Sequence, residues 1–125
     1  MIKGIGIDII EIDRIKGAVE KYGESFIKRV FTEQEIKYCK GRNQYRIPEL
    51  AVRFCAKEAY SKALGTGISG FGSRAKDGIT WKEVEVVNND KGKPLLAIRG
   101  KLDPGAHVSL SHSRDFAVAS VYLEG

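Results

Sequence analysis

The pattern of apolar and polar positions predicts helices in the first half of the chain and strands in the second. The segment Ile2–Asp8 alternates apolar residues with small or polar ones, which predicts a short strand with the aspartate at or near its end. Gly4 and Gly6 lie within this strand, where a second backbone can approach closely. From Glu11 onward, apolar residues recur at helical spacing, and Gly23 is placed to end this first helix.

Two further helices are predicted before the middle of the chain. Thr32 followed by Glu35 forms a capping-box pattern, which favours a helix that runs to about Lys40. Pro48 suits the first position of a third helix, and the apolar pattern continues from there until Gly65.

The remainder of the chain combines a glycine-rich segment with short alternating runs. Residues Gly65–Gly78 are too rich in turn formers for a regular element, which predicts a loop. Four strands are predicted after it, at Trp81–Val87, Leu95–Arg99, His107–Leu110 and Phe116–Leu123, with turns at Asp90–Gly92 and Asp103–Gly105. Short links between consecutive strands imply antiparallel pairing. We therefore expect one α+β domain over residues 1–125, with helices packed on one face of a mostly antiparallel sheet.

Composition and charge narrow the choice of partners only in part. The net charge of +5 favours an anionic partner, which can be a nucleic acid, an acidic protein or a phosphorylated small molecule. Most basic residues alternate with acidic ones, as on the solvated face of a helix. No apolar run approaches the roughly 18 residues that cross a bilayer, and no leader pattern opens the chain, so we expect no membrane partner and a cytoplasmic location. Cys39 and Cys55 lack metal-site spacing and are expected to be reduced, with Cys55 buried.

Three residues could form a phosphate-handling site. Glu58 and Lys62 are four residues apart on one helical face, so a surface ion pair worth about 0.3 kcal/mol would explain them. Apolar residues lie close to that face, however, which favours a functional role for a charge held against the core. Asp8 alone could be a turn or capping residue. If its strand meets the third helix, Asp8 and Glu58 supply two oxygen ligands suited to Mg²⁺, with Lys62 beside them for a phosphate.

Two other motifs carry less information. The string Gly65–Gly70 matches the glycine pattern of dinucleotide sites but follows a helix instead of a strand, so a dinucleotide fold is not predicted. His107, Ser109 and Ser111 share one side of a predicted strand. No catalytic acid or nucleophile elbow accompanies them, and for His107 and His112 a ligand contact and a purely structural role stay open.

Several segments together resemble the holo-(acyl carrier protein) synthases of the 4'-phosphopantetheinyl transferase superfamily. They are Gly4–Ile12, Phe54–Gly67, Gly92–Pro94, His107–His112 and Ala117–Glu124, and their order and spacing also agree with that family. The similarity covers nearly the whole chain. Cys55 replaces a small residue that is usual there, and Ser69–Asp77 matches weakly, which leaves the coenzyme contacts of that segment undefined.

The resemblance implies Mg²⁺-dependent transfer of the 4'-phosphopantetheine group of coenzyme A to a serine of apo-acyl carrier protein, in support of fatty acid biosynthesis. The products are holo-carrier and adenosine 3',5'-bisphosphate. Asp8 and Glu58 would bind the metal, and Lys62 would contact the coenzyme phosphates. Further coenzyme contacts are expected at Ser61, Gly65, Thr66, His107, Ser109 and His112.

The resemblance also implies a homotrimer with active sites between subunits. It places carrier docking on the first helix, at Arg14 and, less directly, Lys16 and Lys21, which would attract an acidic partner. The sequence leaves open whether Glu58 or a magnesium-bound water accepts the proton of the carrier serine.

Two alternatives belong to other classes of protein. The isoelectric point near 9.2 suggests a small nucleic-acid-binding module, with aromatic residues near basic ones at Tyr45, Phe54, Tyr60 and Phe71. No recognised stacking or groove-binding motif supports it, so nucleic acid is not an expected partner. The other alternative is a structural subunit without catalysis, which substitution of Asp8 and Glu58 would test.

Overall fold

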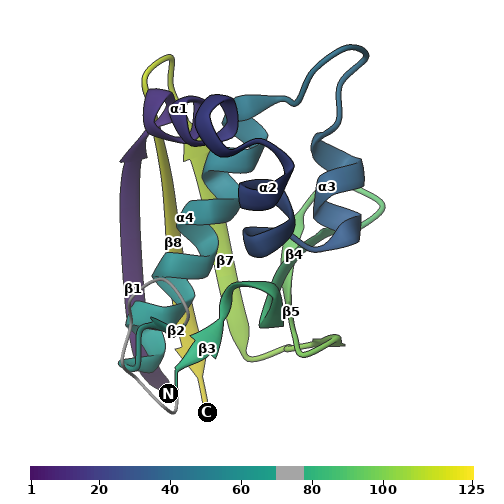
Figure 1. Cartoon of the computed structure of the whole chain (residues 1–125). Helices are drawn as coiled ribbons and strands as arrows, with labels where there is room; N and C mark the ends of the chain where they lie inside the picture. The colour runs from purple at the N-terminus through teal and green to yellow at the C-terminus, as the bar shows by residue number, and fades with distance from the viewer. Residues whose placement is uncertain (70–77) are drawn as a thin grey trace.

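A computed structural model describes residues 1–69 and 78–125 of the chain (Figure 1). Its helices are α1 (Ile12–Tyr22), α2 (Glu24–Val30), α3 (Glu33–Cys39) and α4 (Ile47–Leu64), with a 3-10 turn η1 at Trp81–Glu83. Its strands are β1 (Ile2–Glu11), β2 (Ile68–Ser69), β3 (Ile79–Thr80), β4 (Val84–Asn88), β5 (Pro94–Ile98), β6 (Lys101–Leu102), β7 (Ala106–His112) and β8 (Phe116–Glu124). Within the described residues, no helix is both long and apolar enough to span a membrane.

The main sheet is antiparallel, with strand order β1-β8-β7, and α4 lies across one of its faces (Figure 1). Ala117, Ala119 and Val121 of β8 are buried on the side that α4 covers. In the sheet register, Asp8 pairs with Ala119, which in turn pairs with Leu110. The expected α+β arrangement is confirmed, and it sets Asp8 on the middle of the sheet under the helix.

Two glycines let β1 lie directly against α4. A methyl group on Gly6 would overlap the carbonyl oxygen of Ala59 and lie 2.7 Å from the amide nitrogen of Ala63. A methyl group on Gly4 would overlap the carbonyl oxygen of Ala63. The predicted close approach of a second backbone is therefore confirmed, and the partner is the C-terminal half of α4.

A second antiparallel sheet, β4-β5-β6, extends the core on the other side of α4, with β5 beside β7. Val84, Val86 and Leu96 are buried in it, and α3 packs against β4. The predicted capping box is confirmed, because the Thr32 hydroxyl accepts a hydrogen bond from Glu35 N and the Glu35 carboxylate accepts one from Thr32 N. This places the Glu35 side chain between α3 and β4.

Several predicted boundaries were wrong. The first strand continues three residues past Asp8, because every residue from Gly4 to Glu11 finds a partner in β8. Residues Trp81–Glu83 form a 3-10 turn and not the start of a strand, because Glu83 caps the amide of Thr80. Other strand and turn positions agree with the prediction within two residues.

Four elements were not predicted at all, namely helix α2 and the two-residue strands β2, β3 and β6. Helix α2 follows Gly23 without a linker, and it is fixed by burial of Phe26, Ile27 and Val30. Part of the predicted glycine-rich loop is the short strand β2, which pairs in parallel with β3. The rest of that prediction, residues 70–77, lies outside the described residues.

Candidate functional site

The structure brings Asp8 of β1 and Lys62 of α4 into contact. The Lys62 Nζ lies 3.0 Å from Asp8 Oδ1 and also donates to the carbonyl oxygen of Ile7 at 3.0 Å. Asp8 is mostly buried, whereas half of the lysine side chain stays exposed. Lys62 is therefore held at the rim of the strand–helix contact, where its ammonium group can reach a solvent-borne anion.

Glu58 completes this group from one turn earlier on α4. Partial burial raises the pKa of its carboxyl group, and the nearby charge of Asp8 raises it further, while Lys62 lowers it. Two carboxylates whose charges repel each other are stabilised by a bound cation. Sequence reasoning anticipated this convergence of Asp8 and Glu58 on the condition that β1 meets α4, and the fold meets that condition.

The chemistry of the donor set fits Mg²⁺. In the part of the chain that the structure describes, no group of three or more histidine, cysteine, aspartate or glutamate side chains converges on one point. Asp8 and Glu58 thus offer two hard oxygen ligands and no cage, which suits a cation that keeps several waters and takes phosphate oxygens as further ligands.

Cys55 lies beneath the two carboxylates. Its side chain is fully buried, as expected, and its thiol donates to the carbonyl oxygen of Ala117 at 3.5 Å. Burial raises the pKa of the thiol, and the neighbouring Asp8 adds to that shift. The group is therefore a neutral packing residue in contact with Asp8, a neighbour that sequence reasoning did not identify.

The end of α4 holds three more of the expected coenzyme contacts. The Ser61 hydroxyl is buried and donates to the carbonyl oxygen of Glu58 at 2.7 Å, so its hydrogen is already used within the helix. Gly65 ends the helix in the left-handed conformation, with φ of 82°. The Thr66 hydroxyl is buried, and among the described residues it has no hydrogen-bond partner. Of the three residues, Thr66 is the one whose hydroxyl is left unpaired among the described residues.

The histidines of β7 lie on opposite faces of the sheet. His107 and Ser109 are exposed on the face away from α4, where the His107 Nε2 atom forms a hydrogen bond with the Glu124 carboxylate. Within one chain, the structure does not bring these two residues to Asp8. His112 instead lines a hollow of about 280 Å³ on the α4 side, together with Arg53 and Asn88.

Arg53 is a residue that sequence reasoning missed. It is 2% exposed, and its guanidinium donates to Asn88 Oδ1 at 2.7 Å and to the carbonyl oxygen of Glu49 at 3.1 Å. Its Nε atom has no hydrogen-bond partner among the described residues, and its guanidinium lies 4.2 Å from the ring centroid of Tyr38. The Glu49 carboxylate lines the same hollow and lies 3.7 Å from Arg53 Nη1, so part of the positive charge is already balanced there. The sequence carried no local signal for its burial, because its partner Asn88 lies 35 positions away.

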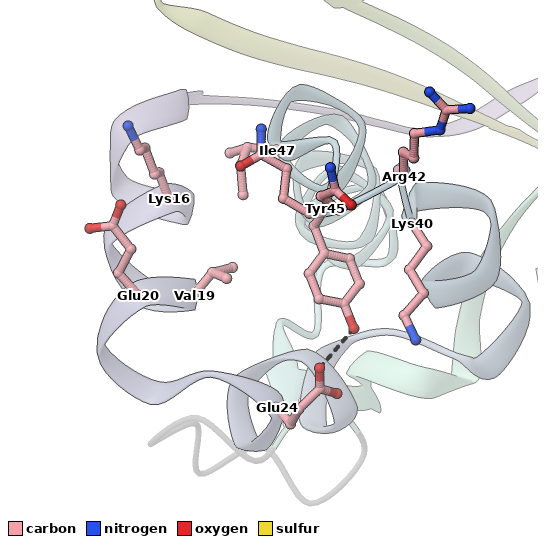
Figure 2. A pocket seen from close by; sticks show the side chains of 11 residues that line it. Lys16, Val19, Glu20, Glu24, Lys40, Arg42, Tyr45 and Ile47 are labelled. Atoms are coloured by element: carbon pink, nitrogen blue, oxygen red, sulfur yellow. Dashed lines mark hydrogen bonds between the residues drawn. The ribbon is translucent and has the colours of Figure 1, made fainter.

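The three candidate docking residues Arg14, Lys16 and Lys21 are all exposed on α1. A hollow of about 540 Å³ lies between this helix and the segment from Lys40 to Ile47 (Figure 2). Lys16 faces it from α1, and Tyr45 stands across it with its hydroxyl donating to Glu24 at 2.9 Å. None of Asp8, Glu58 and Lys62 lines this hollow, which is therefore separate from the two-carboxylate site.

Comparison with known proteins places the chain in a family. Residues 4–121 match the model of the 4'-phosphopantetheinyl transferase superfamily. A holo-[acyl-carrier-protein] synthase of Halothermothrix orenii is 45% identical, over 99% of this chain and 98% of that protein. Among solved structures, a Bacillus anthracis holo-(acyl-carrier-protein) synthase in complex with CoA (3',5'-ADP) is 44% identical, with a TM-score of 0.78 over 98% of this chain and 96% of that one. The Helicobacter pylori holo-[acyl-carrier-protein] synthase in complex with coenzyme A is 28% identical, with a TM-score of 0.78 over 96% and 99% of the two chains. The chain therefore belongs to the 4'-phosphopantetheinyl transferase superfamily, among its holo-(acyl carrier protein) synthases.

Proposed function

We propose that the chain transfers the 4'-phosphopantetheine group of coenzyme A to a serine of an acyl carrier protein, in a Mg²⁺-dependent reaction that supplies fatty acid biosynthesis in the cytoplasm. The observation that carries this proposal is the meeting of Asp8, Glu58 and Lys62 at the contact between β1 and α4. Two carboxylates and one reachable ammonium group match the needs of a diphosphate substrate that arrives with a divalent cation.

In the proposed reaction, Asp8 and Glu58 would hold Mg²⁺, which would neutralise charge on the diphosphate. The Lys62 ammonium group orients the same phosphates and stabilises the charge that develops during transfer. The carrier serine oxygen forms a bond to the phosphorus next to the pantetheine arm, and the bond from that phosphorus to adenosine 3',5'-bisphosphate breaks. The serine proton would pass to a base, which is either the Glu58 carboxylate or a water held by the metal.

We assign the rest of coenzyme A to the face of α4 that leads away from the carboxylates. The hollow lined by Arg53 and His112 offers two nitrogen-rich side chains for a phosphate group. At the other end of α4, the Thr66 hydroxyl is available as a further hydrogen-bond partner. Arg53 lies in the first half of α4 and Thr66 just beyond its C-terminal end, so a ligand that contacts both would be extended along this helix.

We assign carrier docking to α1. Arg14, Lys16 and Lys21 are exposed cations that would attract an acidic carrier. Lys40 and Arg42 add two more cations across the hollow in Figure 2, which the carboxylates of Glu20 and Glu24 also line, so cations outnumber carboxylates there by three to two with Lys16. The docking surface thus continues from the helix across this hollow.

We propose a homotrimer with active sites between subunits. The face of the main sheet opposite α4 carries Ile5, Ile7 and Ile9, each between 60% and 63% exposed, beside Phe116 and Tyr122. An exposed apolar face of this kind is a typical protein-binding surface, and further copies of this chain would cover it. His107 and Ser109 lie on that same face, so in an assembly they could reach a site on a neighbouring subunit. Sedimentation of the protein and of an Ile7→Lys variant would test the assembly.

One assay tests the activity. The protein is incubated with apo-carrier, coenzyme A and Mg²⁺, and the carrier is weighed, because a mass gain equal to phosphopantetheine identifies both reaction and acceptor. Asp8→Asn and Glu58→Gln are expected to fold and to lose activity, and Asp90→Asn, the same change at an exposed turn residue, is the matched control. Full activity in both carboxylate variants would contradict their metal-binding role, and no mass gain with the unaltered protein would contradict the function.

A further inference from the structure

A fully buried ion pair lies on the side of α4 that faces away from β1. Lys57 Nζ is 2.7 Å from Glu35 Oε1, and both side chains are completely buried. The same ammonium group donates to the carbonyl oxygen of Trp81 at 2.9 Å and to the carbonyl oxygen of Val84. All three of its hydrogens therefore have acceptors, as a buried ammonium group requires.

The carboxylate of this pair is also fully bonded. Glu35 Oε1 accepts from Thr32 N at 3.0 Å, and Oε2 accepts from Val86 N at 2.9 Å. The pair thus joins α3, α4, the η1 turn and β4 at one point. A buried ion pair of this kind is not needed for stability alone, because well-packed apolar residues in its place are often equally stabilising.

The pair is coupled to the proposed active site by the geometry of α4. Lys57 and Glu58 are neighbours and point about 100° apart around the helix axis. On one side of α4, Lys57 forms its ion pair with Glu35 of α3. On another side, Lys62 of the next turn forms an ion pair with Asp8 of β1. Directional bonds on two sides resist rotation of the helix about its own axis, in addition to the close packing of α4 against β1.

A small rotation would be enough to misplace Glu58. With side chains extending about 5–6 Å from the axis, a turn of about 10° moves a carboxylate by about 1 Å. A misplacement of about 1 Å can reduce the rate of a reaction by about 100-fold.

We infer that the Glu35–Lys57 ion pair is a positioning device that sets the rotation of α4 and so aims Glu58 at Asp8. This inference rests on the proposed function of the two carboxylates. Lys57 and Glu35 touch neither metal nor substrate, and they act only through the helix.

The test compares Lys57→Met with the unaltered protein at a temperature where circular dichroism shows both to be folded. We expect kcat to fall by about 10- to 100-fold, whereas KM for the carrier stays within about twofold because α1 is unchanged. Binding of Mn²⁺, measured by water proton relaxation, is expected to weaken by about 10-fold, and this readout does not depend on turnover. Lys101→Met, the same change at an exposed position of β6, is the matched control and should leave all three values unchanged.

A double variant, Glu35→Gln with Lys57→Met, separates positioning from stability. It contains no unpaired buried charge, so its melting temperature should recover relative to Lys57→Met, while kcat and Mn²⁺ binding should stay low. Recovery of kcat together with stability would overturn the inference, as would normal kcat and Mn²⁺ binding in Lys57→Met. If Lys57→Met does not fold, the double variant carries the test, and if neither folds the pair serves folding and the inference is wrong. If the unaltered protein transfers nothing, the proposed function fails, and Mn²⁺ binding still decides the role of the pair.

Discussion

The contact between β1 and α4 can be opened by a single methyl group. In a Gly6→Ala variant, the new Cβ would lie 2.7 Å from Ala63 N and would also overlap the carbonyl oxygen of Ala59. Ordinary contact begins at 3.4 Å, so relieving the contact with Ala63 N alone requires a movement of about 0.7 Å. The overlap with the carbonyl oxygen requires more. Both obstacles are backbone atoms of a helix, which cannot rotate away as a side chain can.

Two consequences of this movement can be measured separately. Overpacking of a well-packed core costs about 1–3 kcal/mol, and we expect the upper end of this range because backbone must move. The same movement shifts Asp8 away from Glu58 and Lys62 by a distance approaching 1 Å, so transferase activity should fall by about 10- to 100-fold. Urea unfolding gives the first quantity, and the mass gain of the carrier over time gives the second.

Gly17 provides a matched control. It lies within α1, and a methyl group there would meet no heavy atom within 4 Å. Gly17→Ala should therefore stabilise the protein by about 0.5–1 kcal/mol, because alanine favours a helix over glycine. If Gly6→Ala unfolds at the same urea concentration as the unaltered protein, β1 and α4 are not in the tight contact described, and the reasoning fails.

Three further predictions concern pH and salt. Burial and the charge of Asp8 raise the pKa of Glu58, so its carboxyl group is protonated at a higher pH than that of an ordinary glutamate. As the pH falls, Mn²⁺ binding should therefore weaken at a higher pH than it would with an exposed carboxylate. In Glu58→Gln, this pH-dependent loss of Mn²⁺ affinity should be absent. Burial raises the pKa of the Cys39 thiol from its ordinary 9.0 to about 11. The contribution of this group to the free energy of unfolding is therefore fully present below pH 9 and is lost as the pH rises to about 11. The difference in unfolding free energy between the unaltered protein and Cys39→Ala should shrink by about 2–3 kcal/mol over that range, and a constant difference would contradict the shift. For docking, KM for the carrier should rise with added salt and rise less steeply in Arg14→Ala, and equal salt dependence would exclude this arginine from the docking surface.

The sequence by itself determined the elements whose signals are local. The capping box of Thr32 and Glu35, the end of α4 at Gly65 and the alternation in β1 and β8 each depend on residues a few positions apart. The role of Gly4 and Gly6 was also predictable, because only a close neighbour explains two glycines on one face of a strand. Asp8, Glu58 and Lys62 could be selected from their residue types and from family resemblance.

Only the tertiary structure decided which residues meet. Helix α2 is short and is held by burial of its apolar residues, so its own pattern was too weak to identify it. Arg53 and Lys57 would be interpreted from the sequence as solvated helical charges, yet both are buried because partners 35 and 22 positions away bond them. His107 and His112 are similar in sequence context, and the pleat of β7 sends them to opposite faces of the sheet. The burial and the partners of these residues depend on contacts between segments far apart in the sequence. Such contacts stabilise the protein only after the chain has folded.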